Sequence, residues 1–352
     1  MASPKWVKKT SSQGKSNELY WRGDVQVPNT GLADGPSAVV YKDRIYCFHR
    51  GSGNSADLWY NVYDGSHWRG DTKVPNTGMS AGPSAVLFDD KIYVFHQGSG
   101  GNGELWYNVF DGFRWRGDTK VPNTGMSCGP SAVLFHDNIY VFHQGSSGNG
   151  ELWWNVFDGS SWWGDNKVPN TAMSASPAAR YVPYDRKIYV FHQGGKNNGQ
   201  LWFNVFDGSG WYGDAQVMNV SISTAPSAGT YDGKMFCFHQ GGGNNGQLWY
   251  SRFNGEYWEG DSQVPNTGMS SDPSVVIYND NLYVFHQGSG SNGQLWLGDL
   301  DVVGVSRYDD EFFKRFLHVK RNSDSDSRGK TANGCTSFRG FSGDELRNEE
   351  LA

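Results

Sequence analysis

Short runs of apolar and aromatic residues, separated by Gly, Ser, Asn and Asp, follow one another along most of the chain. In one representative stretch the runs cover residues 83–88, 91–96, 104–110 and 115–121. They are rich in Val, Ile, Tyr, Phe and Trp, and turn residues bound them, which is typical of strands. Asp89-Asp90 and Asp111-Gly112 fall between runs, and Asp-Gly favours a type I′ hairpin turn. The pattern predicts an all-β protein of short strands.

This pattern repeats six times. Trp-x-Gly-Asp recurs at steps of 47, 47, 47, 49 and 47 residues, and the longer step comes from extra residues around 180–184. A Leu-Trp pair and a Tyr-Val-Phe-His-Gln element, degenerate in two copies, recur with it. The Trp-x-Gly-Asp copies begin at Trp21, Trp68, Trp115, Trp162, Trp211 and Trp258.

Four strands in each unit of about 47 residues, with a Trp-containing motif in every unit, predict a six-bladed β-propeller of four-stranded antiparallel blades. The last unit lacks a fourth strand, whereas an extra one, around Trp21, precedes the first unit. We therefore expect the N-terminal strand at 19–24 to complete the last blade and close the ring, which removes exposed sheet edges. A linear array of sheets is the alternative, and it would leave the last unit incomplete.

Two segments lie outside the repeats, so we expect a polar N-terminal extension (1–18), the propeller (19–300) and a C-terminal tail (301–352). Within the tail, residues 309–321 predict a short amphipathic helix with acidic residues leading and basic residues trailing. Its apolar side, around 312–317, would pack on the ring or dock a partner. Residues 322–352 have the composition of a disordered segment.

Composition narrows the possible functions. Gly contributes 47 residues and aromatic residues 15%, which suits strands joined by tight turns. The net charge of −6 gives no basic footprint for nucleic acid, and no apolar run is long enough for membrane insertion. The N-terminus shows no signal peptide, so we expect a cytoplasmic protein or one secreted without such a signal. The four Cys match no zinc pattern and are expected as free thiols.

We expect the loops that are long enough to carry functional residues to lie at one end of the ring. In antiparallel blades the short Asp-Asp and Asp-Gly turns fall at one end, and the long Gly-rich loops and Pro-Asn-Thr-Gly connections fall at the other. One His per unit ends the second strand near these loops. It could anchor the loop by hydrogen bonding, contact a ligand or bind a metal, although equivalent residues around a ring diverge and do not converge on one ion. These residues are His49, His96, His143, His192, His239 and His286.

The third-strand Trp lies near the same end. It could serve packing alone, or act as a platform for the apolar face of a sugar, with amides and carboxylates binding the hydroxyl groups. The six copies are Trp59, Trp106, Trp153, Trp202, Trp249 and Trp296. Five Gln that follow the His are further candidates for ligand binding, with Arg50 in the first unit: Gln97, Gln144, Gln193, Gln240 and Gln287. We expect the fourth-strand Trp, as at Trp115, to fill the space between blades.

Other motifs give less information about function. Arg-Gly-Asp occurs at residues 22–24, 69–71 and 116–118, but it belongs to the Trp-x-Gly-Asp strand, so we do not interpret it as an adhesion motif. A catalytic propeller would need unlike blades at its axis. The innermost strands here are near copies and no acid pair or nucleophile set stands out, so we expect neither catalysis nor a cofactor.

The order Pro-Ser-Ala-Val-Leu-Phe, Lys-Ile-Tyr-Val-Phe-His-Gln, Glu-Leu-Trp-Tyr-Asn-Val-Phe-Asp-Gly and Trp-Arg-Gly-Asp resembles the blades of propeller lectins. It is similar to six-bladed fungal fucose-specific lectins and to the seven-bladed Photorhabdus-type lectins, over about residues 19–300. The resemblance implies sugar binding between adjacent blades. It also implies an Arg in the second strand and a Glu in the third, but the aligned positions are Tyr93 and Tyr107. That fucose clamp is therefore expected to be absent.

Together these patterns indicate a multivalent, non-catalytic lectin whose partners are glycans, fucosylated or related, and which could form homo-oligomers. A protein-interaction scaffold is the alternative interpretation. A propeller-type glycosidase is a third, less favoured one.

Overall fold

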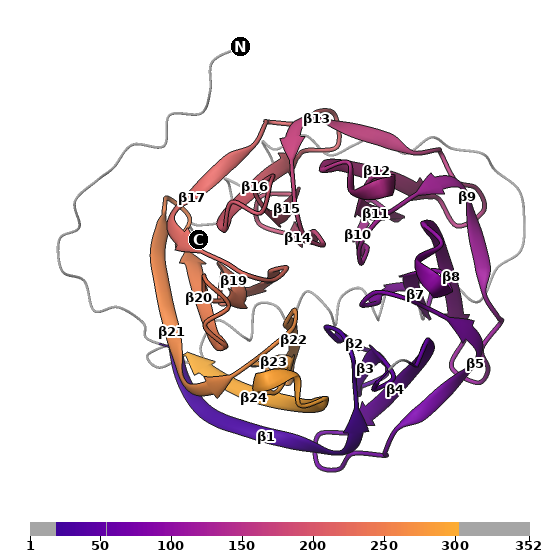
Figure 1. The fold of residues 1–352 in the computed structure, drawn as a ribbon, viewed down its shortest axis with the longest axis horizontal. Helices are drawn as coiled ribbons and strands as arrows, with labels where there is room; N and C mark the ends of the chain where they lie inside the picture. Colours follow the sequence, from indigo (N-terminus) through magenta and orange to yellow (C-terminus); the bar gives the residue numbers. More distant parts are fainter. Residues whose placement is uncertain (1–18, 54, 303–352) are drawn as a thin grey trace, which may run out of the picture. The chain divides into compact units, whose positions relative to one another are not determined.

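Six four-stranded antiparallel sheets stand around a central axis in the computed structural model (Figure 1), which describes residues 19–53 and 55–302. The prediction of an all-β, six-bladed β-propeller is confirmed. The predicted segment 1–18, the helix at 309–321 and the disordered end lie outside the described residues. No helix among the described residues is long and apolar enough to cross a membrane.

Each blade is numbered from its innermost strand outward. Blade 1 has β2 (Ser37–Val40), β3 (Ile45–Arg50), β4 (Asp57–Tyr63) and β5 (Thr72–Gly78). Blade 2 has β6 (Ser84–Phe88), β7 (Lys91–Gln97), β8 (Glu104–Phe110) and β9 (Thr119–Gly125). Blade 3 has β10 (Ser131–Phe135), β11 (Asn138–Gln144), β12 (Glu151–Phe157) and β13 (Asn166–Ala172).

Blade 4 has β14 (Ala178–Val182), β15 (Lys187–Gln193), β16 (Gln200–Phe206) and β17 (Ala215–Ser221). Blade 5 has β18 (Ser227–Tyr231), β19 (Lys234–Gln240), β20 (Gln247–Phe253) and β21 (Trp258–Gly268). Blade 6 has β22 (Ser274–Tyr278), β23 (Asn281–Gln287), β24 (Gln294–Val302) and β1 (Leu19–Gly31). Three 3-10 turns lie in the Gly-rich loops: η1 (Ser99–Gly101), η2 (Ser146–Gly148) and η3 (Ser289–Ser291).

The ring closes as the strand count predicts, because β1 from the N-terminal end is the outermost strand of the last blade (Figure 1). It pairs antiparallel with β24, in a register that sets Trp21 opposite Leu300 and Asp24 opposite Gly298. The first and last described strands are thus joined by backbone hydrogen bonds, and the sixth sheet has the same number of strands as the others.

The outermost strands differ from the sequence-based expectation. Trp115 makes only an isolated bridge to Phe110, and β9 begins at Thr119 instead of Trp115. Between them Gly117 has φ 92°, a backbone conformation that Gly adopts at little cost. The Pro-Asn-Thr-Gly segment, expected as a connection, continues the strand to Gly125, because Asn123 at φ 52° forms a bulge that restores pairing.

The type I′ hairpin turn also lies at a different place from the one predicted from the sequence. Asp111 is not among the residues of positive φ, so the Asp-Gly turn is not of type I′. Instead Asp111 Oδ1 accepts hydrogen bonds from the backbone N–H groups of Phe113 and Arg114. The two positive φ values that a type I′ turn needs occur at Asp89 and Asp90, at 50° and 52°, between the first and second strands.

The hydrophobic core is divided into six clusters, each shared by neighbouring blades. The fourth-strand Trp side chains carry these contacts. Trp162 of blade 3 meets Phe95 of blade 2 edge to face, with ring centroids 6.0 Å apart, and Trp115 of blade 2 meets Phe48 of blade 1 at 5.9 Å. Such pairs contribute about 0.5–1.5 kcal/mol beyond the burial of apolar area. The prediction that these Trp fill the space between blades is confirmed.

Polar contacts between blades supplement the core. The hydroxyl of Ser84 accepts the backbone N–H of Ala132 on the innermost strand of the next blade, at 2.9 Å, and four other blades contribute equivalent bonds. Farther out, Asn108 donates to Thr77 Oγ1 of the preceding blade at 2.7 Å. Five of the six innermost strands therefore donate a backbone hydrogen bond to the preceding blade, and the strand of blade 5, which faces Ala178, is the exception.

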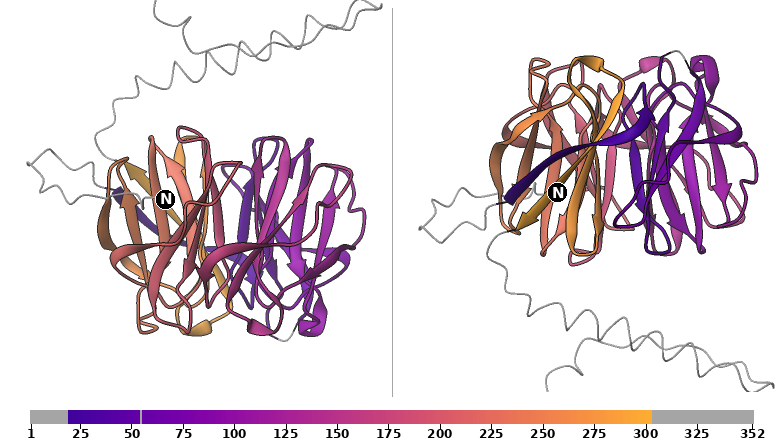
Figure 2. Two further views of the ribbon diagram at one scale, coloured as in Figure 1. Left: turned by 90° about the horizontal axis from the view of Figure 1, so that it is seen from above. Right: turned by 90° about the horizontal axis from the view of Figure 1, so that it is seen from below.

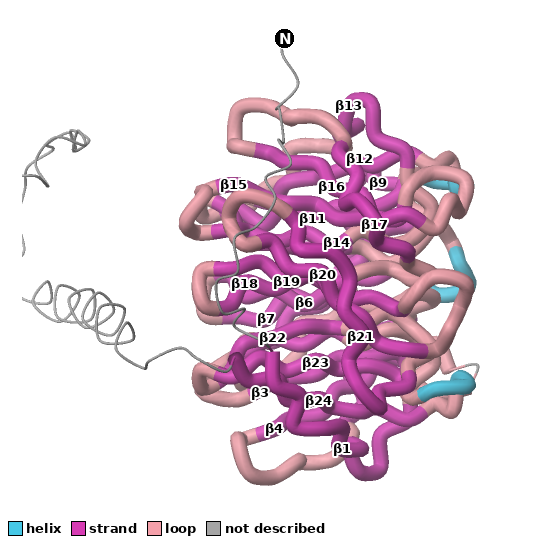
Figure 3. Tube along the Cα trace, turned by 90° about the vertical axis from the view of Figure 1, so that its left-hand side faces the viewer, coloured by secondary structure: helices cyan, strands magenta, loops and turns pink. Residues whose placement is uncertain are grey.

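The two ends of the ring are unlike. The Gly-rich loops with their 3-10 turns gather at one end, and the short hairpin turns gather at the other (Figures 2 and 3). We call the first end the loop-rich face. It receives the C-terminal ends of the second strands and the N-terminal ends of the third strands, as predicted.

We predict that removing residues 1–31, and with them β1, lowers the melting temperature by at least about 10 °C. The deletion exposes the edge of β24 and removes Asp24, the hydrogen-bond partner of buried His286. Thermal unfolding followed by circular dichroism measures the effect. A chain that lacks only residues 1–18 keeps all of β1 and serves as the control, and equal melting of the two truncations would contradict the role given to β1.

Candidate functional site

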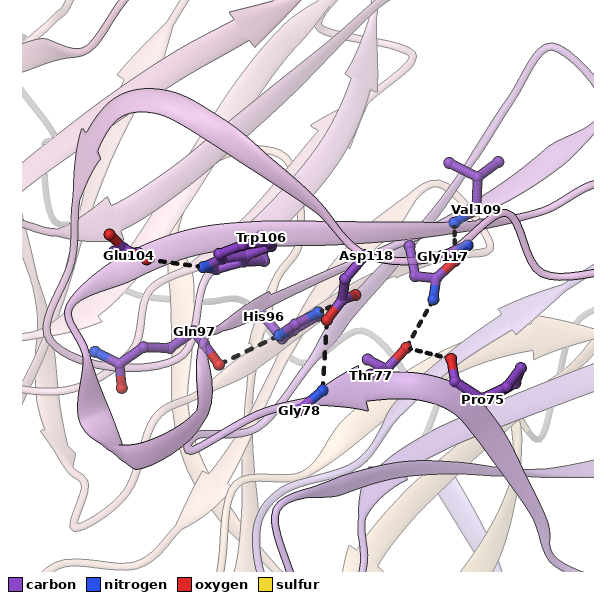
Figure 4. A network of polar contacts seen from close by, with 11 residues as sticks. Pro75, Thr77, Gly78, His96, Gln97, Glu104, Trp106, Val109, Gly117 and Asp118 are labelled. Atoms are coloured by element: carbon purple, nitrogen blue, oxygen red, sulfur yellow. Dashed lines mark hydrogen bonds and ion pairs between the residues drawn. The ribbon is translucent and has the colours of Figure 1, made fainter.

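The six His at the ends of the second strands are completely buried and belong to structural pairs. His96 Nε2 lies 3.0 Å from Asp118 Oδ1, and its Nδ1 lies 3.2 Å from the Gln97 carbonyl oxygen (Figure 4). Asp118 is the Asp of Trp-x-Gly-Asp, so the pair fastens the second strand to the start of the fourth. The other blades repeat it with Nε2 to Oδ1 distances of 2.8–3.2 Å.

The five candidate Gln are also engaged in the fold. Gln97 donates from Nε2 to the Met126 carbonyl oxygen at 3.1 Å and accepts the Ser80 hydroxyl at Oε1. All five are 4–7% exposed, and each donates to the equivalent carbonyl, including that of Leu32 across the ring closure. In blade 1, Arg50 replaces Gln, pairs with Asp34 and donates to the Ser80 carbonyl oxygen.

These contacts leave the His and Gln outside the site that we develop below. His side chains with no exposed surface reach a ligand only if the blade rearranges, so the loop-anchoring interpretation describes what they do here. Among the described residues no group of three His, Cys, Asp or Glu could hold a metal ion. The three described Cys are free. Pairing with His also occupies the Asp of each Arg-Gly-Asp segment.

The six third-strand Trp are partly exposed, unlike the His and Gln. Around Trp106, the Nε1–H donates to Glu104 Oε2 at 3.2 Å (Figure 4). Lys120 on the fourth strand pairs with the other oxygen of Glu104. Asn102, from the Gly-rich loop, donates to the same carboxylate at 3.1 Å. The Lys120 ammonium bonded to Glu104 lowers the pKa of that carboxyl group. We call these four residues, and the residues at the same positions in the other blades, the Trp platform. In blades 4–6 the Nε1 atoms of Trp202, Trp249 and Trp296 are buried without a hydrogen-bond partner.

The platforms fall into two classes that differ in charge. Blades 1–3 combine an acid with a cross-strand Lys, and blades 4–6 combine two Gln at the same positions. The pairs are Asp57 with Lys73, Glu104 with Lys120, Glu151 with Lys167, Gln200 with Gln216, Gln247 with Gln263, and Gln294 with Gln26. Sequence reasoning named the Trp but missed Asn102 and Lys120. The signal for Lys120 was this joint exchange of acid and Lys for two Gln among the repeats.

The positions aligned with the fucose clamp are occupied by packed aromatic rings. Tyr93 and Tyr107 stack with centroids 6.0 Å apart, and both contact Phe157 of the next blade. Trp162 also packs against Tyr107, at 5.9 Å. The space between blades at this depth is therefore filled by aromatic side chains.

A separate cavity of about 160 Å³ lies on the ring axis, lined by the starts of the six innermost strands. Its lining contains one carboxyl group, Asp272, whose Oδ1 accepts the Ala225 N–H at 2.8 Å. Burial raises the pKa of Asp272 to about 7, despite that hydrogen bond. Arg180 lines the same cavity, so the innermost strands are less alike than the sequence analysis supposed.

No family model matches the chain, and no curated protein matches its sequence. Among solved structures, a triple arginine-to-alanine mutant of AofleA from Arthrobotrys oligospora is 15% identical, with a TM-score of 0.60, over 80% of this chain and 87% of that one. The Aleuria aurantia lectin, described as a fungal lectin with a six-bladed β-propeller fold and a fucose recognition mode, is 16% identical, with a TM-score of 0.56, over 80% and 99%. The Trypanosoma rangeli sialidase, in complex with the inhibitor DANA, is 12% identical, with a TM-score of 0.56, over 84% and 58%.

At these identities the likeness establishes the fold alone. The protein is a six-bladed β-propeller, and the resemblance to propeller lectins seen in the repeats is confirmed at the level of architecture. The same architecture is found in a lectin and in a sialidase, so function has to be argued from the sites themselves.

We predict that Asp118→Asn destabilises the protein by about 1–3 kcal/mol, because it removes the anionic partner of a fully buried His. Urea denaturation measures the change. Asp89→Asn is the control, since Asp89 pairs with Lys91 at the surface and such pairs contribute about 0–1 kcal/mol. Equal stability of Asp118→Asn and the parent protein would show that the buried pair contributes nothing.

A second prediction concerns pH. The raised pKa of Asp272 means that the folded protein binds this proton more tightly than the unfolded chain, so ionisation destabilises the fold as pH rises from about 4 through 7. Asp272→Asn removes that cost. Its melting temperature should exceed that of the parent protein by several degrees at pH 8, and the difference should shrink toward pH 4. Asp137→Asn, in an exposed turn, is the control, and a pH-independent difference for Asp272→Asn would contradict the assignment.

Proposed function

We propose that this protein is a multivalent, non-catalytic carbohydrate-binding protein, a lectin, whose sites are the Trp platforms. One observation carries the proposal: a partly exposed Trp, bordered by hydrogen-bonding side chains, recurs in all six blades. A ring that needed its Trp only for packing would have no reason to surround each one with a carboxylate or amide, an Asn or another polar residue, and a Lys or Gln.

The chemistry of the platform suits a sugar. The C–H groups on one face of a pyranose pack on an indole ring, while the hydroxyl groups exchange hydrogen bonds with groups that can both donate and accept. At Trp106 the acceptors are the oxygens of Glu104, and the donors are the Asn102 amide and the Lys120 ammonium. Because these side chains already hold one another, little conformational entropy is lost on binding.

The two classes of platform imply unequal sites. Blades 1–3 present a charged pair beside the Trp, and blades 4–6 present two neutral amides. We propose that the neutral platforms favour uncharged glycans, and that the charged platforms also accept glycans that carry a carboxylate, through Lys73, Lys120 and Lys167.

Fucosylated glycans are one class within this proposal, supported by the likeness to the Aleuria aurantia lectin. The filled positions at Tyr93 and Tyr107 oppose the same binding mode, so fucose would be bound at the Trp platforms. Glycan-array binding of the full chain, with fucosylated and non-fucosylated arms, identifies the sugar. Binding to proteins of a cell extract but to no glycan would instead favour a protein-interaction scaffold.

A glycosidase is the second candidate, since a sialidase shares the architecture. The axial cavity has one carboxyl group and no Tyr among its lining residues, whereas glycosidases usually use a pair of acids and sialidases use a Tyr as nucleophile. Release of chromophore from nitrophenyl glycosides by the purified protein would replace the lectin proposal with an enzymatic one.

We predict that titration with the sugar selected by the array gives several sites per chain, up to six, each with a dissociation constant on the order of 0.1–1 mM for a monosaccharide. Trp106→Ala should remove about one site and leave the others, because each platform is local to its blade. Isothermal titration calorimetry measures both the number of sites and the affinity.

Trp163→Ala provides the matched control. Trp163 is also an exposed Trp, at 58%, but it bonds to Asp158 beside a hairpin turn away from the Trp platforms. Loss of binding in this variant, or a single site per chain insensitive to all six platform Trp, would place the ligand elsewhere.

A further inference from the structure

The axial cavity contains a feature that the platforms do not explain. Its lining is made of small residues from the first positions of the innermost strands, and Arg180 is the one Lys or Arg among them. In the other five blades the lining stops at the second residue of the strand. In blade 4 it extends to the third, which is Arg180, so this residue contributes to the lining of a cavity of about 160 Å³.

Arg180 is poorly compensated by the protein. Its Nη2 donates to Thr230 Oγ1 of the next blade at 3.1 Å, whereas its Nε is buried without a hydrogen-bond partner. Within the part of the chain that the structure describes, Arg180 forms no ion pair. Burial lowers the pKa of its guanidinium group. A partly buried charge without a counter-charge is unfavourable, and a bound anion would offset that cost.

The other blades show that a charge here is not needed to build the ring. Blades 1, 2, 3 and 6 carry Val at the position of Arg180: Val39, Val86, Val133 and Val276. The partner position changes with it. Where Arg180 meets Thr230, the other blades have apolar residues in place of Thr: Val40, Leu87, Leu134, Tyr181 and Ile277. The polar pair is thus confined to one place on a ring that is otherwise apolar at this depth.

We propose that the axial cavity binds one small oxyanion, carrying a carboxylate or phosphate group, on Arg180. The planar guanidinium of Arg presents parallel N–H groups that match two oxygens of such an anion. The cavity volume suits a ligand of a few heavy atoms and is too small for an oligosaccharide.

The other charged group of the lining does not neutralise Arg180. Asp272 lies at the loop-rich end of the cavity, where it bonds to the Ala225 N–H, and makes no ion pair with Arg180. When the repeats are aligned, Asp272 of blade 6 corresponds to Ser176 of blade 4. Arg180 lies four residues after Ser176, so the two charged residues occupy different positions in their repeats. The site is therefore distinct from the Trp platforms and independent of the proposed lectin function.

The test uses the full chain and two probes, sodium phosphate and sodium acetate, at ionic strength matched with sodium chloride. Binding to the folded state alone stabilises it by RT ln(1 + c/Kd), where c is the probe concentration. We therefore expect little change in melting temperature well below an apparent dissociation constant of about 1 mM, and a rise with the logarithm of probe concentration above it. The probe with the larger effect tells whether phosphate or carboxylate is preferred.

Arg180→Val installs the residue found in four other blades, and it should raise the apparent dissociation constant at least about tenfold. Arg180→Gln, a polar residue without charge, must show the same loss, and it decides the question if the Val variant does not fold. Arg186→Gln, which removes an exposed charge from the same blade, should respond as the parent protein does. Absence of this rise in the parent protein, or a rise in both Arg180 variants as large as in the parent protein, would overturn the proposal.

Discussion

The buried pair between a second-strand His and the Asp of Trp-x-Gly-Asp is the interaction on which the rest of each blade depends. The His ring meets a carboxylate at Nε2 and a backbone carbonyl at Nδ1, so both ring nitrogens face acceptors inside a dry interior. Fixing the Asp fixes the Gly of positive φ before it, and with it the point where the fourth strand begins. The same pair, made by His286 and Asp24, joins the two ends of the ring.

Residues that recur equally in every repeat therefore have different roles in the structure. Rigidity of the loop-rich face accounts for the recurrence of His96, Gln97 and Asp118. Their polar atoms make hydrogen bonds within the fold. The third-strand Trp recurs on the same face with part of its surface exposed. A rigid ring that presents six equivalent aromatic positions suits recognition of repeated ligands, because weak sites on one scaffold gain from effective concentration.

Much of this could be predicted from the sequence. Strand number, blade number, ring closure and the packing of Trp115 follow from the repeat itself, because a unit that cannot bury its own apolar face must bury it against its neighbour. Burial of individual polar side chains could not be predicted, since His96 and Trp106 occupy adjacent strand ends and periodicity treats both as candidates. The type I′ turn was misplaced because Asp-Gly and Asp-Asp both tolerate positive φ, and the side-chain bonds of Asp111 decided between them.

Departures from the repeat carry information that the repeat cannot. At the platforms, the acid and the Lys of blades 1–3 are exchanged together for two Gln in blades 4–6. At the axis, Arg180 and Thr230 replace apolar residues together, in two blades that differ from the others. A mutation tolerated at random would change one partner at a time and leave a buried polar group alone, which costs about 1–3 kcal/mol. Paired change within one chain therefore indicates selection for a local arrangement, both at the platforms, where blades 1–3 differ in charge from blades 4–6, and at the axis, where Arg180 of blade 4 meets Thr230 of blade 5.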